Sequence, residues 1–170
     1  MDKYQILQKY FGYSEFRRGQ AEIIDAITSG CDAVGIMPTG GGKSICFQVP
    51  ALMFPGVSLI ISPLISLMKD QVNALKAYGV NAAYFNSTLN ESQMKREGDK
   101  VLQGVCKIVY VAPERLSSPS FRALCSKIEI SMVCIDEAHC VSQWGQDFRP
   151  SYLDIKDFIG ALPKRPVVAA

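Results

Sequence analysis

Short apolar runs alternate with amphipathic stretches along the chain, and this alternation restricts its fold more than any other feature. The runs have the β-branched composition and length of buried strands; they cover residues 33–37, 57–62, 80–85, 107–111, 131–135 and 167–170. The stretches between them have helical spacing and cover residues 44–52, 64–78, 91–102, 120–127 and 152–161. Strand–helix–strand alternation predicts an α/β fold, with a mostly parallel sheet covered by helices on both faces.

Both ends of the chain add to this pattern. Helical stretches at residues 4–11 and 19–28 precede the first predicted strand. The run at 166–170 reads as a strand that stops where a loop should begin, so we expect a single domain cut from a longer protein. A short final edge strand is the alternative.

Composition limits the possible functions. The net charge of +2 excludes a nucleic-acid binder that works through bulk positive charge alone, although a local basic groove remains possible. No stretch has the roughly 18 uninterrupted apolar residues of a spanning helix, and the N-terminus has no apolar signal core, so we expect a cytoplasmic protein without a membrane partner. The six cysteines lack the spacing of a metal or redox pair, and we expect buried reduced thiols.

A glycine-rich segment, Met-Pro-Thr-Gly-Gly-Gly-Lys-Ser at residues 37–44, follows the first predicted strand and opens a helix. It matches the phosphate-binding pattern G-x-x-x-x-G-K-S/T except that Met37 replaces the first glycine. Glycines let backbone N–H groups surround phosphate oxygens at a helix N-terminus. We expect Lys43 to neutralise the β- and γ-phosphates and Ser44 to bind Mg²⁺; a flexible turn with a surface lysine is the alternative. The predicted nucleotide-binding residues here are Thr39, Gly40, Gly41, Gly42, Lys43 and Ser44.

The strand predicted at 131–135 ends in the sequence Asp-Glu-Ala-His at 136–139. Its carboxylates then lie at the C-terminal edge of the sheet, where open α/β sheets bind ligands. Asp136 is suited to Mg²⁺, and Glu137 is suited to orient the attacking water or accept its proton. Asp136 as a helix N-cap is the alternative.

The segment after these acids is polar and loop-like, and it holds Trp144, the only tryptophan, soon after His139, the only histidine. Trp144 and Phe148 beside Arg149 have the chemistry to stack on bases and contact phosphate. A structural histidine and a core tryptophan are the alternatives.

These segments together resemble the first RecA-like motor lobe of RecQ-family DNA helicases, in helicase superfamily two. The resemblance runs from about Tyr4 to Ala170: residues 37–44 resemble motif I, residues 136–139 motif II, and residues 143–150 the aromatic-rich loop that couples DNA contact to ATP hydrolysis. It implies ATP and Mg²⁺ as cofactors. The catalytic residues it implies are Lys43, Asp136, Glu137 and His139.

The same resemblance extends to other segments. Residues 11–20, within N-terminal helices at 1–30, are similar to an adenine-recognition motif, which implies that Gln20 bonds the adenine edge while Tyr13 and Arg17 pack on its faces. Gln146 stands where the family commonly has histidine. The DNA-coupling residues implied are Ser62, Pro63, Ser66, Asn86, Ser87, Arg115, Trp144, Phe148 and Arg149.

By this resemblance the full-length protein is an ATP-dependent 3′ to 5′ DNA helicase of recombination and repair, in the bacterial cytoplasm or nucleoid. Its DNA partner is single-stranded or a duplex with a single-stranded 3′ tail. The second RecA-like lobe, with its arginine fingers, is absent from residues 1–170, so this ATP-binding domain, truncated at its C-terminal end, should hydrolyse little ATP alone. An RNA-directed motor of the same superfamily and a non-enzymatic nucleotide-binding module are the alternatives.

Overall fold

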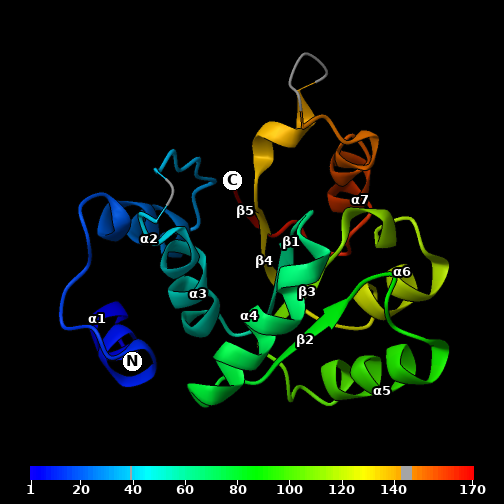
Figure 1. The fold of residues 1–170 in the computed structure, drawn as a ribbon, viewed down its shortest axis with the longest axis horizontal. Coiled ribbons are helices and arrows are strands. Elements are labelled where there is room, and N and C mark those ends of the chain that lie inside the picture. The colour runs from blue at the N-terminus through cyan, green and yellow to red at the C-terminus, as the bar shows by residue number, and fades with distance from the viewer. Residues whose placement is uncertain (39, 143–146) are drawn as a thin grey trace.

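Five parallel strands form one sheet in the order β2-β3-β1-β4-β5 (Figure 1). The computed structural model describes residues 1–38, 40–142 and 147–170, so the roles predicted for Thr39 and Trp144 lie outside the described residues. The strands are β1 Val57–Ile61, β2 Ala82–Phe85, β3 Ile108–Val111, β4 Ile130–Ile135 and β5 Val167–Ala169. The predicted α/β fold with a parallel sheet is confirmed.

Helices occupy the stretches where the helical spacing predicted them. The α-helices are α1 Lys3–Ile6, α2 Gln20–Thr28, α3 Lys43–Met53, α4 Ile65–Ala77, α5 Glu91–Leu102, α6 Pro119–Cys125 and α7 Ile155–Gly160. A π-helical turn, η1 Leu7–Phe11, continues α1, so the stretch predicted at 4–11 changes its helix type midway. The short 3₁₀ turns are η2 Pro113–Arg115, η3 Ala138–Val141 and η4 Pro150–Tyr152.

The central strand β1 shows why the sheet is covered on both faces. All five of its residues are buried, and successive side chains point to opposite faces. Leu59 packs in a cluster with side chains of α5, α6 and α7. Ile60 packs in a second cluster with α2, α3 and α4, so each face of the sheet has its own helix layer (Figure 1). Because all the strands are parallel, their carboxyl ends meet at one edge of the sheet.

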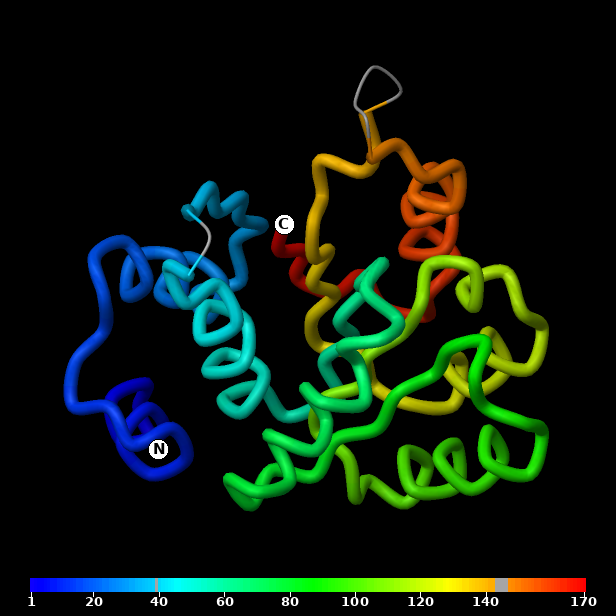
Figure 2. The backbone as a smooth tube through the Cα atoms, viewed as in Figure 1, coloured from blue at the N-terminus to red at the C-terminus, as the bar shows by residue number. Residues whose placement is uncertain are grey.

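The strand predicted at 33–37 is wrong. Ala33 forms one isolated parallel bridge with Ala169, and the Gly35 amide donates to the Ala170 carbonyl at 2.8 Å. The C-terminal residues thus lie beside this early segment (Figure 2). Val34 and Ile36 are 78% and 97% exposed. The segment pairs with the sheet only beside the three residues of β5, so no longer strand forms here.

The prediction of buried thiols is confirmed for five cysteines and wrong for Cys31, which is exposed. Cys31 follows the left-handed Gly30 in the turn after α2, outside both helix layers. Within the described ranges, no helix combines the length and apolar character needed to cross a membrane.

We expect Phe158→Ala to lower the free energy of unfolding by about 3–5 kcal/mol, because it leaves a large cavity in the core. Phe158 of α7 is 1% exposed and stacks on Phe121 with 6.2 Å between ring centroids. Leu153→Ala is the matched control, since Leu153 is 46% exposed and should change the free energy by less than about 0.5 kcal/mol. Urea unfolding followed by circular dichroism measures both, and similar losses would contradict this packing.

Candidate active site

Asp136 is held at the carboxyl end of the sheet by main-chain and side-chain hydrogen bonds. Its amide donates to the Ile61 carbonyl at 2.8 Å, which extends the β1–β4 pairing by one residue. The Ser62 hydroxyl donates to Asp136 Oδ2 at 3.1 Å, and the Glu137 amide donates to Asp136 Oδ1 at 3.0 Å. Both carboxylate oxygens therefore have a partner, and the carboxylate has one orientation.

Glu137 adopts a left-handed backbone conformation with φ 51° and ψ 46°. It is the only non-glycine residue with positive φ among the described residues. This conformation costs an ordinary side chain about 1–2 kcal/mol, and such strain is concentrated at functional sites. The turn directs the Glu137 carboxylate toward Lys43, whose Nζ donates to Glu137 Oε1 at 2.9 Å.

Lys43 is the first residue of α3, directly after the glycine-rich loop. Gly42, the N-cap, has φ 81°, and no side chain caps the first amides of this helix. The positive φ of Gly42 favours glycine at this position. A Cβ atom there would also lie 2.6 Å from Gln20 Nε2, which would have to shift. Uncapped amides at a helix N-terminus, next to a lysine, form a binding site for an anion.

The charges at this edge are only partly balanced. Burial, and then the charge of Glu137, raise the pKa of Asp136, while the Ser62 hydrogen bond and Lys43 oppose this rise. The hydrogen bond to Glu137 raises the pKa of Lys43. A cation beside Asp136 would therefore be favourable, since it compensates the charge of a half-buried carboxylate.

Two cavities lie at the acids. The larger, of about 510 Å³, is lined by Lys43, Asp136, Glu137 and His139 together with residues 34–37. The smaller, of about 60 Å³, is lined by Ser44, Ser62 and Asp136 among others. A hydroxyl and a carboxylate on one small cavity fit Mg²⁺, which takes few protein ligands and completes its shell with water and phosphate oxygens. Among the described residues, no cluster of three or more His, Cys, Asp or Glu side chains could hold a metal ion.

His139 lies beside the Glu137 carboxylate. Its Nδ1 lies 3.4 Å from Glu137 Oε2, and its side chain is 59% exposed. The fold thus brings together four predicted residues from two segments more than ninety positions apart; they are Lys43, Asp136, Glu137 and His139.

The N-terminal segment bonds the glycine-rich loop directly. Gln20 is buried, and its Nε2 donates to the carbonyls of Gly42 at 3.0 Å and Gly41 at 3.3 Å. Arg17 Nη1 donates to the Gly40 carbonyl at 2.7 Å, while Tyr13 is exposed. The role of these residues in binding adenine stays a prediction, and it requires Gln20 to exchange its present bonds.

The residues implied to couple DNA follow the ends of neighbouring strands, but they differ in exposure. Ser62, Pro63 and Asn86 are buried, and Ser62 serves Asp136 as described. Asn86 Oδ1 accepts from the Thr88 amide and hydroxyl, and its carbonyl accepts from Arg115 Nη2 at 3.0 Å. The more accessible members are Ser66, Ser87 and Arg149, which are exposed, and Arg115 and Phe148, which are half-buried.

Sequence reasoning missed one residue of this site. Tyr152 of η4 is 3% exposed, and its hydroxyl donates to the Asp136 carbonyl at 2.8 Å. The sequence offers no signal that separates Tyr152 from other core aromatics, because its partner is a main-chain atom sixteen positions away.

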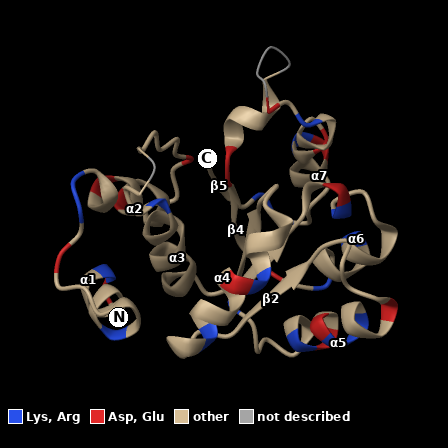
Figure 3. Cartoon of the chain, in the orientation of Figure 1, with Lys and Arg blue, Asp and Glu red and all other residues tan. Residues whose placement is uncertain are grey.

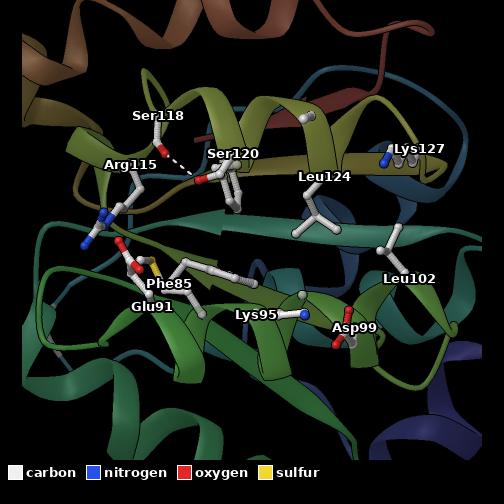
Figure 4. Close-up of a pocket in the computed structure, with 14 residues that line it drawn as sticks. Phe85, Glu91, Lys95, Asp99, Leu102, Arg115, Ser118, Ser120, Leu124 and Lys127 are labelled. Carbon is white, nitrogen blue, oxygen red and sulfur yellow. Dashed lines mark hydrogen bonds between the residues drawn. The ribbon is translucent and has the colours of Figure 1, made fainter.

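Another cavity of about 510 Å³ lies between α5 and α6, away from the acids (Figure 4). Phe85, Leu102 and Leu124 give it a mainly apolar wall, with Lys95 and Asp99 near its rim. Basic and acidic residues are interspersed along α5, so this side has no field of one sign (Figure 3). The candidate site is therefore the edge that carries the acids and the glycine-rich loop.

Comparison with known proteins places the chain in a family. A family profile described as DEAD/DEAH box helicase matches residues 17–169. The chain belongs to the DEAD/DEAH box helicase family. Membership in this family implies the use of ATP, typically with Mg²⁺.

Individual members of the helicase family are also similar. The chain is 51% identical over 166 residues to "ATP-dependent DNA helicase RecQ" of Bacillus subtilis, which covers 97% of this chain and 28% of that protein. It is 41% identical over 170 residues to "Putative ATP-dependent RNA helicase R290" of Acanthamoeba polyphaga mimivirus, with 97% of this chain and 30% of that protein covered. The chain thus spans less than a third of the length of these relatives.

A solved helicase has the same fold. The crystal structure of the DUF1998 helicase MrfA bound to DNA superposes with a TM-score of 0.80, covering 99% of this chain and 26% of that one, at 16% identity. At this identity the likeness establishes the RecA-like fold alone.

We expect Asp136→Asn to stabilise the chain at pH 7 in the absence of nucleotide. The folded state raises the pKa of Asp136 above its ordinary value of 3.8, so ionisation at neutral pH costs stability. This cost should shrink as the pH falls through the raised value, and the advantage of the variant should disappear near pH 3.8. The midpoint of thermal unfolding, measured from pH 7 to pH 4, follows the effect.

Asp70→Asn is the control for this prediction, because Asp70 is an exposed acid on α4. It should leave the midpoint nearly unchanged at every pH. A destabilised Asp136→Asn variant at pH 7 would show that the folded state favours the charge of Asp136.

Proposed function

We propose that this chain is the N-terminal ATP-binding lobe of an ATP-dependent 3′ to 5′ DNA helicase of the RecQ type. The observation that carries the proposal is the ion pair between Lys43 and Glu137, which joins the glycine-rich loop to the acids at the end of β4. Phosphate-binding and water-activating groups then meet in one cavity. Similarity to a RecQ helicase over 97% of the chain supports the same assignment.

In this proposal the first amides of α3 and Lys43 bind the β- and γ-phosphates. Ser44 and Asp136 hold Mg²⁺, which neutralises charge on the phosphates when it is bound. Gln20, Arg17 and Tyr13 lie on the adenine side of the loop, within N-terminal helices at residues 1–30. Thr39, Gly40 and Gly41 complete the loop.

The ion pair suggests an order of events on this lobe. Glu137 pairs with Lys43, whose Nζ lies 2.9 Å from Glu137 Oε1. Phosphates draw Lys43 away, because they carry more negative charge than one carboxylate. Glu137 is then free to orient water or accept its proton, and His139 beside it steadies the carboxylate.

DNA binds the same edge in this proposal, through exposed residues such as Ser66, Ser87 and Arg149. A net charge of +2 predicts few phosphate contacts and weak affinity for the lobe alone. Residues 1–170 serve as an ATP-binding domain that acts with a second RecA-like lobe on single-stranded DNA or a duplex with a 3′ tail. The full-length protein works in recombination and repair, in the cytoplasm or nucleoid.

An RNA-directed motor is the second candidate, favoured by the 41% identity to a protein named as a putative RNA helicase. Matched DNA and RNA oligonucleotides distinguish the two. We expect DNA to stimulate ATP hydrolysis by the full-length protein more strongly, whereas equal stimulation would favour the RNA motor.

We expect Lys43→Ala to weaken binding of Mg²⁺·ATP to this chain by about 10- to 100-fold, since it removes a charged contact to phosphate. Isothermal titration calorimetry measures the affinity. Lys69→Ala is the matched control, because Lys69 is an exposed lysine on α4 and its loss should have little effect. Equal affinities for the two variants would rule out the phosphate role of Lys43.

We expect Glu137→Gln in the full-length protein to keep ATP binding and lower DNA-stimulated turnover by about 100-fold or more, because the amide cannot accept a proton. A steady-state phosphate-release assay measures turnover. Glu129→Gln is the control, since Glu129 is exposed and remote from the cavity. Turnover near the wild-type rate in Glu137→Gln would remove Glu137 from this role.

A further inference from the structure

The peptide that joins the two acids is held by a side chain from a different segment. Tyr152 donates its hydroxyl hydrogen to the Asp136 carbonyl at 2.8 Å. We propose that Tyr152 is a positioning residue for ATP hydrolysis: its hydroxyl fixes the Asp136–Glu137 peptide and thereby directs the Glu137 carboxylate. This inference rests on the proposed function and extends it to a residue outside the recognised motifs.

Main-chain geometry explains how one hydroxyl can have this effect. The Asp136 amide is bonded to the Ile61 carbonyl, and the Asp136 carbonyl is bonded to Tyr152, so residue 136 is fixed on both sides. Glu137 then enters its left-handed turn, which the Cys140 amide closes by donating to the Glu137 carbonyl at 2.9 Å. Rotation of the 136–137 peptide would change the direction of the Glu137 side chain.

Tyr152 is itself rigid enough to act as an anchor. Its ring is buried in the cluster that contains Ile155 and Phe158 of α7. The Arg149 amide donates to the Cys140 carbonyl, and the Tyr152 amide donates to the Arg149 carbonyl, both at 3.0 Å. A tyrosine hydroxyl carries its proton at neutral pH, so it is available as a donor.

The same turn reaches the acids by a second route. Arg149 Nη1 donates to the Pro63 carbonyl at 3.4 Å, next to Ser62, whose hydroxyl bonds Asp136 Oδ2. The short segment 149–152 therefore makes two contacts near Asp136. Tyr152 bonds the Asp136 carbonyl, and Arg149 bonds the residue next to Ser62, which in turn bonds the Asp136 carboxylate. Arg149 is also among the residues that resemblance assigns to DNA contact, so a DNA contact and the orientation of the acids share one turn.

A second buried tyrosine, Tyr110, has a different kind of hydrogen-bond partner for its hydroxyl. Tyr110 is equally buried, and its hydroxyl accepts a hydrogen bond from the side chain of Gln48 at 3.1 Å. The Tyr152 hydroxyl instead bonds the carbonyl between the two acids.

Tyr152→Phe tests the proposal, because it removes the hydroxyl and keeps the ring in the core. The first arm uses this chain without nucleotide. Hydrogen–deuterium exchange of peptides covering residues 136–141 should accelerate several-fold, while the midpoint of thermal unfolding falls by no more than about 5 °C. Unchanged exchange at 136–141 would overturn the proposal. A fall in the midpoint of more than about 10 °C would also overturn it, since the hydroxyl would then serve the whole fold.

The second arm uses the full-length protein with DNA and ATP. We expect kcat to fall about tenfold while the KM for ATP stays within about threefold, because the hydroxyl orients Glu137 rather than binding nucleotide. Tyr84→Phe is the matched control, since Tyr84 of β2 is half-buried and remote from both acids, and its turnover should be unchanged. A kcat equal to that of the wild type in Tyr152→Phe would overturn the proposal.

A double variant separates positioning from a structural effect. In the Glu137→Gln background, Tyr152→Phe should cause no further loss of single-turnover rate, because the group that it orients has already been disabled. A further tenfold loss would overturn the proposal, because Tyr152 would then act through another group. Failure of the wild-type protein to hydrolyse ATP would instead count against the proposed function, and the exchange arm would still test the contact.

Discussion

The partly buried charge of Asp136 is the constraint on which the rest of the site depends. The sheet fixes the position of this carboxylate at the end of β4 but also removes part of its hydration, and this desolvation raises its pKa. Ser62, the Glu137 amide and the nearby Lys43 all compensate for it. The glycine-rich loop, the strained turn and the core tyrosine are thus arranged around one carboxylate that the fold places where a cation would relieve its cost.

Local pattern predicted the architecture well, because helix and strand periods are properties of neighbouring residues. The pattern failed at 33–37, where an apolar run lies beside the short edge strand β5 and leaves Val34 and Ile36 exposed. Composition alone cannot tell a central strand from a segment at the border of a sheet. The exposed Cys31 has the same cause, since burial depends on which elements cover a turn.

The sequence predicts those parts of the candidate site that lie within short, contiguous motifs. The loop and the acids were recognised because each motif lies within a few residues, and the parallel sheet brings Lys43 and Glu137 into contact. The left-handed turn at Glu137, the bonds from Gln20 to the loop and the hydroxyl of Tyr152 were not predictable in this way. Each of these features joins a side chain to a main-chain group or depends on a backbone angle. The types of the residues in the sequence do not reveal either one.

The bonds from Gln20 and Arg17 to the loop carbonyls have a thermodynamic consequence. A ligand that takes up the Gln20 amide must release the carbonyls of Gly41 and Gly42, and a ligand that rearranges the loop must in turn release Gln20. Under the proposed role of Gln20 in adenine binding, the two halves of a nucleotide are linked through the protein, and by reciprocity each changes the affinity for the other by the same factor. The same proposal makes selectivity for the base and affinity for the phosphates one coupled quantity.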